Sequence, residues 1–337
     1  MIHRLLYSPF LVQMVVVRKC NLACGYCNEF DDSSPPVDTS VLKARIDKID
    51  ELGAFSLELT GGEPLLHPDL PDLIAHAKTK RFRKVMLISN AFLMDERKIE
   101  ALNKAGLDDL QVSVDGVKPN DVTIKVLKSV RPKLELLSRL ARFRVTLSGV
   151  IGSAAPEEAL EVVLFAKEKG FRPRVLLIHG ADGQLRLSAE EMELYKRIQR
   201  EIGERFSEAH DYRAKLMEGK AAPFKCRAGS RYLYVDEFGT VRWCSQTFQD
   251  FGIPLEKYSN ADLRRQFSTH KPCTEQCTLG CARTTSAYDE WRGQELDPDP
   301  AYANAEPLFR ISPHPSRREG AAAEGSSASL PEGARGS

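Results

Sequence analysis

The chain of 337 residues lacks three features: an excess of one charge, a long hydrophobic run and a secretion signal. Lysine and arginine total 48, and aspartate and glutamate total 47. This balance argues against a surface built chiefly for nucleic acid or an anionic membrane. No hydrophobic run approaches the ~20 residues of a membrane span, and the first residues do not follow the order of a signal peptide. We therefore expect a cytoplasmic protein with no membrane span and no nucleic-acid partner.

Cysteine is scarce and unevenly distributed. Three of the eight cysteines lie close together near the N-terminus, and none lies in the long stretch that follows. In a cytoplasmic protein, grouped cysteines bind metal more often than they form disulfides. The distribution therefore predicts two metal-binding regions. The first contains Cys20, Cys24 and Cys27, and the second contains Cys226, Cys244, Cys273, Cys277 and Cys281.

Hydrophobic stretches typical of strands alternate with amphipathic stretches typical of helices. Such alternation predicts crossover units on a parallel sheet, and six units predict an incomplete, TIM-like (βα)6 barrel over residues 1–219. The expected strands are 10–18, 56–59, 84–89, 110–114, 144–151 and 174–178. The expected helices are 39–52, 72–80, 95–105, 122–141, 156–169 and one that begins with a capping box at Ser188 and Glu191.

The pattern changes after residue 219. Residues 232–235 and 241–243 form an expected hairpin between Cys226 and Cys244, which predicts a small second domain over residues 220–305. Residues 306–337 are rich in Ser, Ala, Gly, Pro, Arg and Glu without periodicity. We expect this tail to be disordered, because it has too few apolar side chains to form a core.

The N-terminal cysteines follow the first expected strand in the order Cys20-Asn-Leu-Ala-Cys24-Gly-Tyr-Cys27. Soft thiolates bind iron–sulfur clusters or zinc. A closed zinc site requires four protein ligands, whereas a [4Fe–4S] cluster held by three cysteines keeps one iron open. This spacing, directly after a strand, resembles the cluster loop of the radical S-adenosylmethionine (radical SAM) enzymes. The alternatives are a zinc knuckle or three unrelated buried thiols.

The resemblance covers roughly residues 10–180 and implies a set of cofactors. Cys20, Cys24 and Cys27 would hold a [4Fe–4S] cluster whose fourth iron binds the amino and carboxylate groups of S-adenosylmethionine (SAM). An electron from a donor such as flavodoxin or ferredoxin would then cleave SAM to a 5′-deoxyadenosyl radical, which abstracts hydrogen from a substrate. The resemblance also implies that Tyr26 packs over the adenine.

Further segments match motifs of the same family. The turn Gly61-Gly62-Glu63-Pro64 matches the motif after strand two, whose backbone carbonyls would accept hydrogen bonds from the methionine ammonium. Asn90, after strand three, lies where the family often binds the ribose hydroxyls. The alternative for Asn90 is an Asx-type turn.

Two more segments match the family after strands four and five. Ser113 and Asp115 match a segment that lines the ribose and the methionine carboxylate, although Asp115 with the following glycine could form only a turn. Val150 and Ile151 match a segment whose backbone contacts adenine. The alternative for these two residues is an ordinary buried strand.

The C-terminal cysteines resemble part of the auxiliary-cluster extension called the SPASM domain. A full SPASM domain has seven cysteines, and this chain has five, so the shortened "twitch" form with one auxiliary [4Fe–4S] cluster fits better. The resemblance implies ligation by Cys226, Cys244 and two of Cys273, Cys277 and Cys281. A four-cysteine zinc site is the alternative.

The expected function is that of a radical SAM enzyme whose auxiliary cluster supports oxidation or bond formation. The chain starts almost at strand one, which slightly favours a small-molecule or lipid substrate over a peptide. Peptide crosslinking or epimerisation is the alternative within the family. A non-catalytic iron–sulfur redox protein and a zinc-binding interaction protein are the alternatives from other classes.

Overall fold

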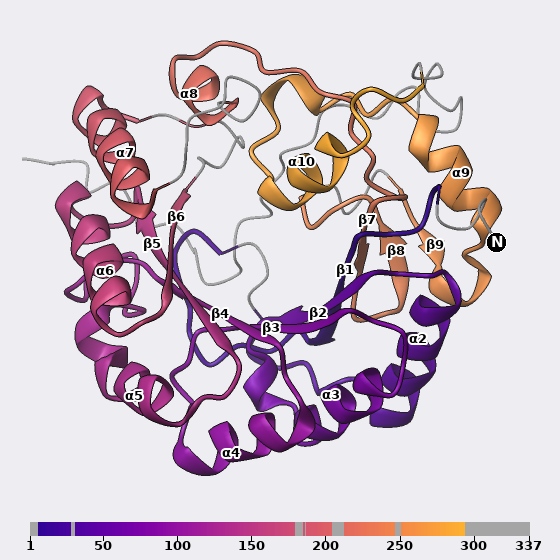
Figure 1. Ribbon diagram of the computed structural model, residues 1–337, viewed down its shortest axis with the longest axis horizontal. Helices are drawn as coiled ribbons and strands as arrows, with labels where there is room; N and C mark the ends of the chain where they lie inside the picture. The colour runs from indigo at the N-terminus through magenta and orange to yellow at the C-terminus, as the bar shows by residue number, and fades with distance from the viewer. Residues whose placement is uncertain are drawn as a thin grey trace, which may run out of the picture.

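The computed structural model describes residues 6–27, 31–178, 185, 187–203, 212–246 and 251–293. One sheet organises this part of the chain, with nine strands in the order β6-β5-β4-β3-β2-β1-β7-β8-β9. The sheet curves into an open barrel with most helices on its outer side (Figure 1). The expected disordered tail, 306–337, and the last residues of the expected second domain lie outside the described residues.

The six expected barrel strands are confirmed in order and direction. Each pairs in parallel with the next, so their carboxyl ends lie at the same edge of the barrel. Their bounds are β1 Leu11–Val17, β2 Ser56–Gly61, β3 Lys84–Ser89, β4 Asp109–Val114, β5 Arg144–Ile151 and β6 Arg172–Leu177.

The connecting helices lie outside the barrel and bury their hydrophobic faces against it. The capping box predicted at Ser188 and Glu191 is present at the start of α7. The helix bounds are α2 Thr39–Glu51, α3 Leu70–Lys78, α4 Glu96–Ala105, α5 Leu127–Leu140, α6 Pro156–Glu168, α7 Ala189–Ile202 and α8 Tyr212–Met217, with a short 3-10 helix, η1, at Pro64–Leu66.

The long helix expected from residue 122 starts five residues later. Residues 122–126 instead form a loop that bonds to neighbouring segments. The Gly25 N–H donates to the Val122 carbonyl, and the Asp115 N–H donates to the Lys125 carbonyl. Because these backbone groups bond outside the helix, the prediction was wrong for this segment. The loop brings Thr123 and Lys125 to the carboxyl end of β4.

The C-terminal region extends the barrel sheet at its β1 edge. Strand β7 (Tyr232–Val235) pairs in parallel with β1, and it forms the expected antiparallel hairpin with β8 (Thr240–Arg242). The sheet therefore continues across the predicted boundary near residue 219, and the division into two domains stays a prediction. The remaining elements are β9 Ile253–Pro254, η3 Leu255–Lys257, α9 Asn260–Ser268, η4 Thr274–Gln276 and α10 Gly280–Ala287.

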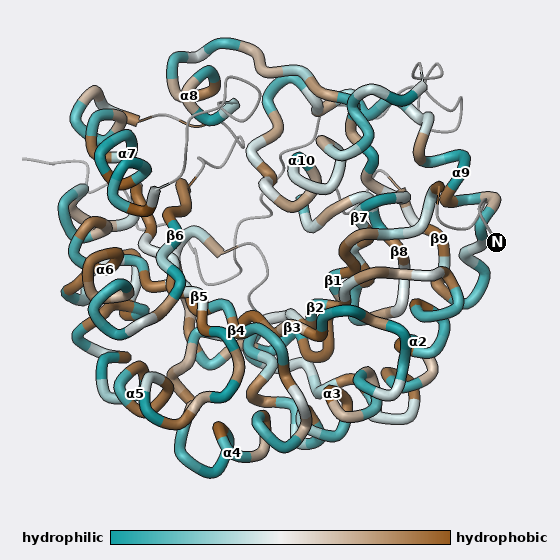
Figure 2. The backbone as a smooth tube through the Cα atoms, viewed as in Figure 1, coloured by the Kyte–Doolittle hydropathy of each residue, from teal (hydrophilic) through white to brown (hydrophobic). Residues whose placement is uncertain are grey.

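The hydrophobic core lies between the sheet and the outer helices (Figure 2). Alternate side chains of a strand face opposite sides of a sheet, so Val12, Met14 and Val16 of β1 share one face and are fully buried. Among the described residues, no helix has the length and hydrophobicity to cross a membrane.

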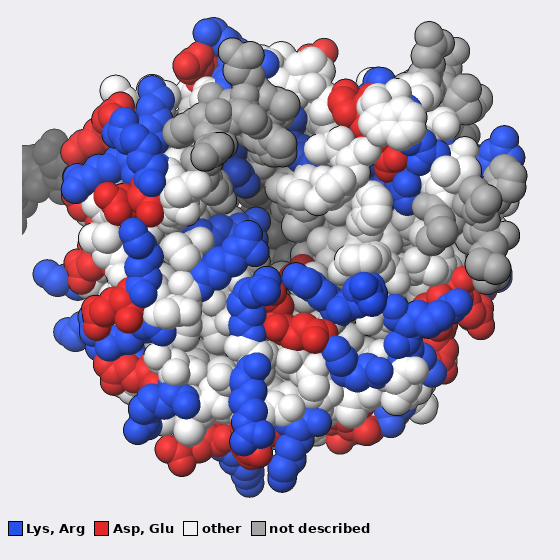
Figure 3. Space-filling model, in the orientation of Figure 1, with Lys and Arg blue, Asp and Glu red and all other residues white. Residues whose placement is uncertain are grey.

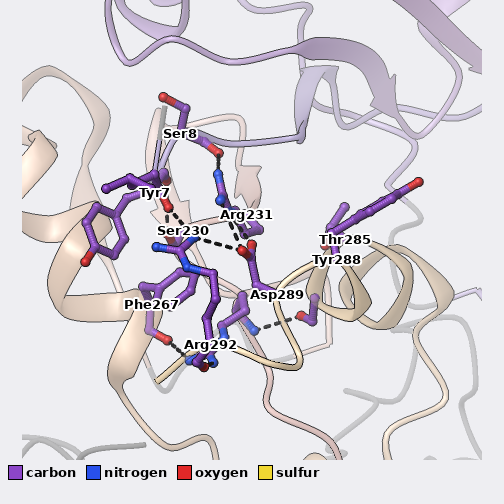
Figure 4. A network of polar contacts seen from close by, with 12 residues as sticks. Tyr7, Ser8, Ser230, Arg231, Phe267, Thr285, Tyr288, Asp289 and Arg292 are labelled. Atoms are coloured by element: carbon purple, nitrogen blue, oxygen red, sulfur yellow. Dashed lines mark hydrogen bonds and ion pairs between the residues drawn. The ribbon is translucent and has the colours of Figure 1, made fainter. Parts of the chain in front are cut away.

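A buried polar clamp ties the segment before β1 to the C-terminal region (Figure 4). The Asp289 carboxylate pairs with Arg231 at 2.6 Å and with Arg292 at 2.8 Å. These two arginines also donate to the carbonyls of Ser8 and Leu6, at 2.7 and 2.8 Å. Since a buried charge is stable only when paired, this clamp fixes the C-terminal region against the start of the barrel.

Candidate functional site

The N-terminal cysteine loop lies at the carboxyl end of β1. The Cys20 N–H donates to the Asp31 carbonyl at 2.8 Å, and the Cys27 N–H donates to the Cys24 carbonyl at 3.0 Å. These bonds fold the chain so that Cys20, Cys24 and Cys27 stay free of disulfides and partly exposed. Three thiols are thus held on one turn with access from outside.

The two glycines of the turn after β2 are required by their packing against the end of β1. Gly61 has φ +148°, and a Cβ there would lie 2.0 Å from the Val17 carbonyl oxygen. A Cβ on Gly62 would lie 2.2 Å from the carbonyl oxygen of Arg18. Only glycine fits these positions. Close contact with the chain leading to Cys20 therefore accounts for both glycines without a ligand.

Glu63 is fully buried and organises the same edge. Its carboxylate accepts hydrogen bonds from Leu65 N–H at 2.9 Å, Ser89 hydroxyl at 2.8 Å and Asn90 N–H at 2.7 Å. Burial raises the pKa of Glu63, and these donors counteract part of that rise. Pro64 follows as the first residue of η1. Glu63 thus joins the turn after β2 to the end of β3.

Asn90 lies next to the cysteine loop. Its side-chain amide donates to the Asn21 side chain at 2.9 Å and lies 3.8 Å from the Cys20 sulfur. Its side-chain oxygen accepts from the Phe92 N–H at 3.0 Å. This bond forms the Asx-type turn considered as the alternative. The Asx-type turn is thus present and directs the side-chain amide at the cysteine loop, while the ribose contact stays a prediction.

Asp115, which follows β4, is the centre of a buried polar cluster. Its carboxylate accepts from the Tyr26 hydroxyl at 2.6 Å and the Thr123 hydroxyl at 2.8 Å, and it pairs with the Lys125 ammonium at 3.2 Å. Burial and the neighbouring Asp115 raise the pKa of Tyr26 far above its ordinary range. The phenol therefore stays protonated and anchors the cysteine loop to β4.

The sequence analysis missed Lys125. Its ammonium contacts the Tyr26 hydroxyl at 2.7 Å and the Ser113 hydroxyl at 3.1 Å. It is also near enough to Cys20 to counter the rise in pKa that burial gives that thiol. The signal that could have identified it is the turn-forming Pro119-Asn120-Asp121, which indicates a loop before the helix.

Val150 and Ile151 lie at the end of β5, and both side chains are buried. The Ile151 carbonyl accepts from the Ile178 N–H at 3.0 Å, so its backbone is already bonded to the neighbouring segment. The side chains show a packed strand end, which fits the alternative of an ordinary buried strand. The adenine contact stays a prediction.

The C-terminal cysteines divide into four and one. The pKa of Cys277 is raised to about 12, mainly by burial and next by the nearby Cys226 and Cys244. The same two thiols and Cys277 also raise the pKa of Cys273, beyond the main effect of burial. Such mutual effects need short distances. Cys226, Cys244, Cys273 and Cys277 therefore lie near one another, and all but Cys273 are buried.

Cys281 faces the inside of the barrel. Its sulfur lies 3.8 Å from the side-chain amide of Gln13 in β1. Burial raises its pKa to about 11, with Glu58 of β2 as the next cause. Helix α10, which carries this cysteine, lies on the concave side of the sheet in Figure 1. Cys281 thus contacts the barrel interior, and Cys244 also contributes to its raised pKa.

The spacing of the sulfur atoms bears on whether a single ion could be held. Zinc–sulfur bonds of about 2.3 Å would bring four thiolates within roughly 4 Å of each other. Among the described residues, no three His, Cys, Asp or Glu side chains converge in a way that would hold one metal ion. A four-iron cluster holds its thiolates farther apart than a single zinc ion does, and the choice between the two for the C-terminal cysteines stays a prediction.

Comparison with known proteins supports this chemistry. The sequence profile of the radical SAM superfamily matches residues 14–198. The PqqA peptide cyclase of Gluconobacter oxydans is 27% identical over 92% of this chain and 93% of its own length. A probable GTP 3′,8-cyclase of Archaeoglobus fulgidus is 38% identical over 31% of this chain and 35% of its own length.

The fold also has counterparts among solved structures. Streptococcus suis SuiB bound to S-adenosylmethionine superposes with a TM-score of 0.63 at 14% identity, covering 88% of this chain and 77% of that one. At this identity the likeness concerns the fold. Because the superfamily profile matches more than half of the chain, the protein belongs to the radical SAM superfamily, whose members are enzymes that use a [4Fe–4S] cluster and S-adenosylmethionine.

Proposed function

We propose that this radical SAM enzyme modifies a peptide substrate and that an auxiliary [4Fe–4S] cluster supports the reaction. Similarity to a PqqA peptide cyclase is the observation that carries the proposal, because it covers 92% of this chain and 93% of that protein. The similarity to a GTP 3′,8-cyclase covers less than a third of the chain. We therefore favour the peptide substrate over the small-molecule or lipid substrate that the sequence analysis favoured.

The cluster that binds SAM would be held by Cys20, Cys24 and Cys27. These three thiols form no disulfides and are partly exposed, and three ligands would leave one iron for SAM. When bound, this group supplies one electron for reductive cleavage of SAM and so generates a 5′-deoxyadenosyl radical. The protein's part is to orient SAM and exclude water. Its reductant would be a small electron donor such as flavodoxin or ferredoxin.

Residues at the strand ends would orient SAM. Lys125 and Ser113 are placed to bind the methionine carboxylate, since the ammonium and hydroxyl lie 3.1 Å apart and Lys125 is partly exposed. Asp115 would hold the Lys125 ammonium in place.

The other strand-end positions stay predictions carried by the family resemblance. The turn Gly61-Gly62-Glu63-Pro64 would contact the methionine ammonium, and Asn90 would contact the ribose. Tyr26 would line the adenine together with Val150 and Ile151.

The auxiliary cluster would be held by Cys226, Cys244, Cys273 and Cys277. Their mutual effects on pKa support this set, and Cys281 would remain free of it. Four thiolates close such a cluster to outside ligands, so its role would be electron transfer. An electron leaving a substrate radical could pass through it, which gives a net oxidation.

Release of 5′-deoxyadenosine from SAM with dithionite tests the enzyme class. The anaerobic, reconstituted protein should release it, and peptides should increase release while forming a product of altered mass. No release from protein with intact clusters would leave the non-catalytic redox alternative. Colourless protein with stoichiometric zinc would instead support the zinc alternative.

A further inference from the structure

Polar side chains line the inside of the barrel between β6 and α10. Arg174 of β6 pairs in register with Ser148 of β5, which pairs with Ser113 of β4. Gly149 faces α6, because a Cβ on it would lie 2.7 Å from the Ala159 carbonyl oxygen. Side chains alternate along a strand, so Ser148 and Arg174 face the opposite side, which is the barrel interior. Figure 3 shows a recess at the centre of the barrel with Lys and Arg side chains near β5 and β6.

Arg174 carries a charge that no protein carboxylate neutralises at close range. Its guanidinium donates to the Gln111 side chain at 2.7 Å, and no ion pair joins it to a carboxylate in the part of the chain that the structure describes. Burial raises the pKa of Glu58, and Arg174 counters this rise only from a distance. A partly buried cation without a direct counterion favours the binding of an anion.

The N-terminus of α10 lies close to Arg174. A Cβ on Gly280 would lie 3.2 Å from an Arg213 guanidinium nitrogen, 3.5 Å from the Tyr212 hydroxyl and 3.8 Å from Arg174 Nη2. Three donor groups thus lie close around Gly280, and a side chain at this position would press against the Arg213 guanidinium. The first N–H groups of a helix lack partners within it and favour negative charge.

Two hydroxyls at this site have unused hydrogen-bonding capacity. The oxygens of Tyr212 and Ser148 are buried, and neither has a hydrogen-bond partner among the described residues. Ser148 is fully buried and lies beside Arg174 in the register of β5 and β6. A buried hydroxyl without a partner is costly, so an acceptor that reaches Tyr212 would relieve part of that cost.

We propose that Arg174, Tyr212, Arg213 and Gly280 form a carboxylate cradle that binds an acidic side chain of the substrate. This inference rests on the proposed peptide substrate. Arg174 and Ser113 lie in register on strands that are two positions apart in the sheet, a separation of roughly 10 Å. Ser113 contacts Lys125 of the proposed SAM site. A substrate carboxylate in the cradle would therefore hold the rest of the substrate beside the proposed SAM site. Recognition would select peptides with an acidic residue near the reacting carbon.

Calorimetric titration of the anaerobic holoenzyme with SAM tests the cradle. The probes are N-acetyl-L-glutamate N-methylamide, its neutral glutamine counterpart and glutarate as a free small acid. The glutamate probe should bind at least about 10-fold tighter than the glutamine probe, because a charge-assisted hydrogen bond is lost in the latter. Arg174→Gln should remove this preference, and Gly280→Ala should weaken binding of the glutamate probe by filling the cradle.

Arg172→Gln is the matched control, because Arg172 is exposed on the same strand. It should keep the preference, and iron content and circular dichroism should show that all variants fold. Three results would overturn the cradle: equal binding of the glutamate and glutamine probes, a preference for the glutamate probe that survives Arg174→Gln, or no binding of either the glutamate probe or glutarate. If glutarate alone bound, a small acid would replace the peptide as its ligand. Release of 5′-deoxyadenosine in the same preparation tests the enzyme class separately.

Discussion

The two cysteine groups differ in number, exposure and surroundings. Cys20, Cys24 and Cys27 are partly exposed on a loop, beside the Asp115–Lys125 pair. Cys226, Cys244 and Cys277 are only 5%, 8% and 7% exposed. The first group is thus partly exposed throughout, whereas in the second group only Cys273 is partly exposed and the other three are buried.

The difference indicates separate tasks. A centre that binds a cofactor needs an incomplete ligand set and polar groups around the opening. A centre that only passes electrons is better closed, because burial excludes solvent and other ligands. Each group has a cation nearby. Lys125 lies near the three-cysteine group. Arg283 lies at the four-cysteine group, where its guanidinium donates to the Cys277 carbonyl at 2.7 Å.

The largest expected effect comes from substituting one cysteine of each group. Cys24→Ala should abolish release of 5′-deoxyadenosine, because the cluster would lose one of three anchors. Cys244→Ala should keep part of the uncoupled release while blocking product formation. Chromatography of both products measures this. Normal release by Cys24→Ala would remove the distinction between the two groups.

The second effect sharpens the division of the C-terminal cysteines. Cys277→Ala should lose about half of the bound iron, since one of two four-iron clusters would be destabilised. Cys281→Ala is the matched control and should keep its iron, because Cys281 faces Gln13 and not the group of four. Iron and sulfide analysis after reconstitution measures both. The reverse pattern would place Cys281 among the ligands.

The third effect concerns the clamp that holds the C-terminal region. Asp289→Ala should lower the free energy of unfolding by about 3 kcal/mol, because it leaves the Arg231 charge buried and unpaired. Glu193→Ala is the control, since its pair with Arg200 is well exposed and should contribute little. Anaerobic thermal unfolding measures the difference. Equal shifts in melting temperature would show that the clamp does not hold this region.

The smallest expected effect tests the cation beside the three-cysteine group. Lys125→Met should weaken SAM binding about 10-fold, because one charge-assisted hydrogen bond is lost. Lys128→Met, in the exposed part of α5, should leave binding unchanged. Equilibrium binding of SAM to the reconstituted protein measures both. Unchanged affinity in Lys125→Met would assign that lysine to Asp115 and the fold.

Sequence patterns predicted the barrel well, because strands and helices follow local periodicity. The alternation of six strands and helices, the capping box of α7 and the β7–β8 hairpin are confirmed. The spacing of the three N-terminal cysteines was sufficient to identify the superfamily, which the family match confirms. The parallel pairing of β7 with β1 joins distant segments, and no local pattern indicated it.

The surroundings of the site were less predictable. Lys125 was expected inside a helix, and only long-range bonds such as that from the Asp115 N–H to its carbonyl hold it in a loop. The spacing of Cys273, Cys277 and Cys281 is regular, so it could not show which of them faces the barrel. That depends on the orientation of α10 against the sheet. The roles of the predicted SAM-binding and cluster-binding residues stay predictions.

Electron paramagnetic resonance of the dithionite-reduced protein, with and without SAM, tests the central contrast most directly. The account predicts two cluster signals, of which SAM shifts only one, and the shifted signal should vanish in Cys24→Ala while the other remains. A SAM-dependent shift that survives in Cys24→Ala, or no shift of either signal, would contradict it.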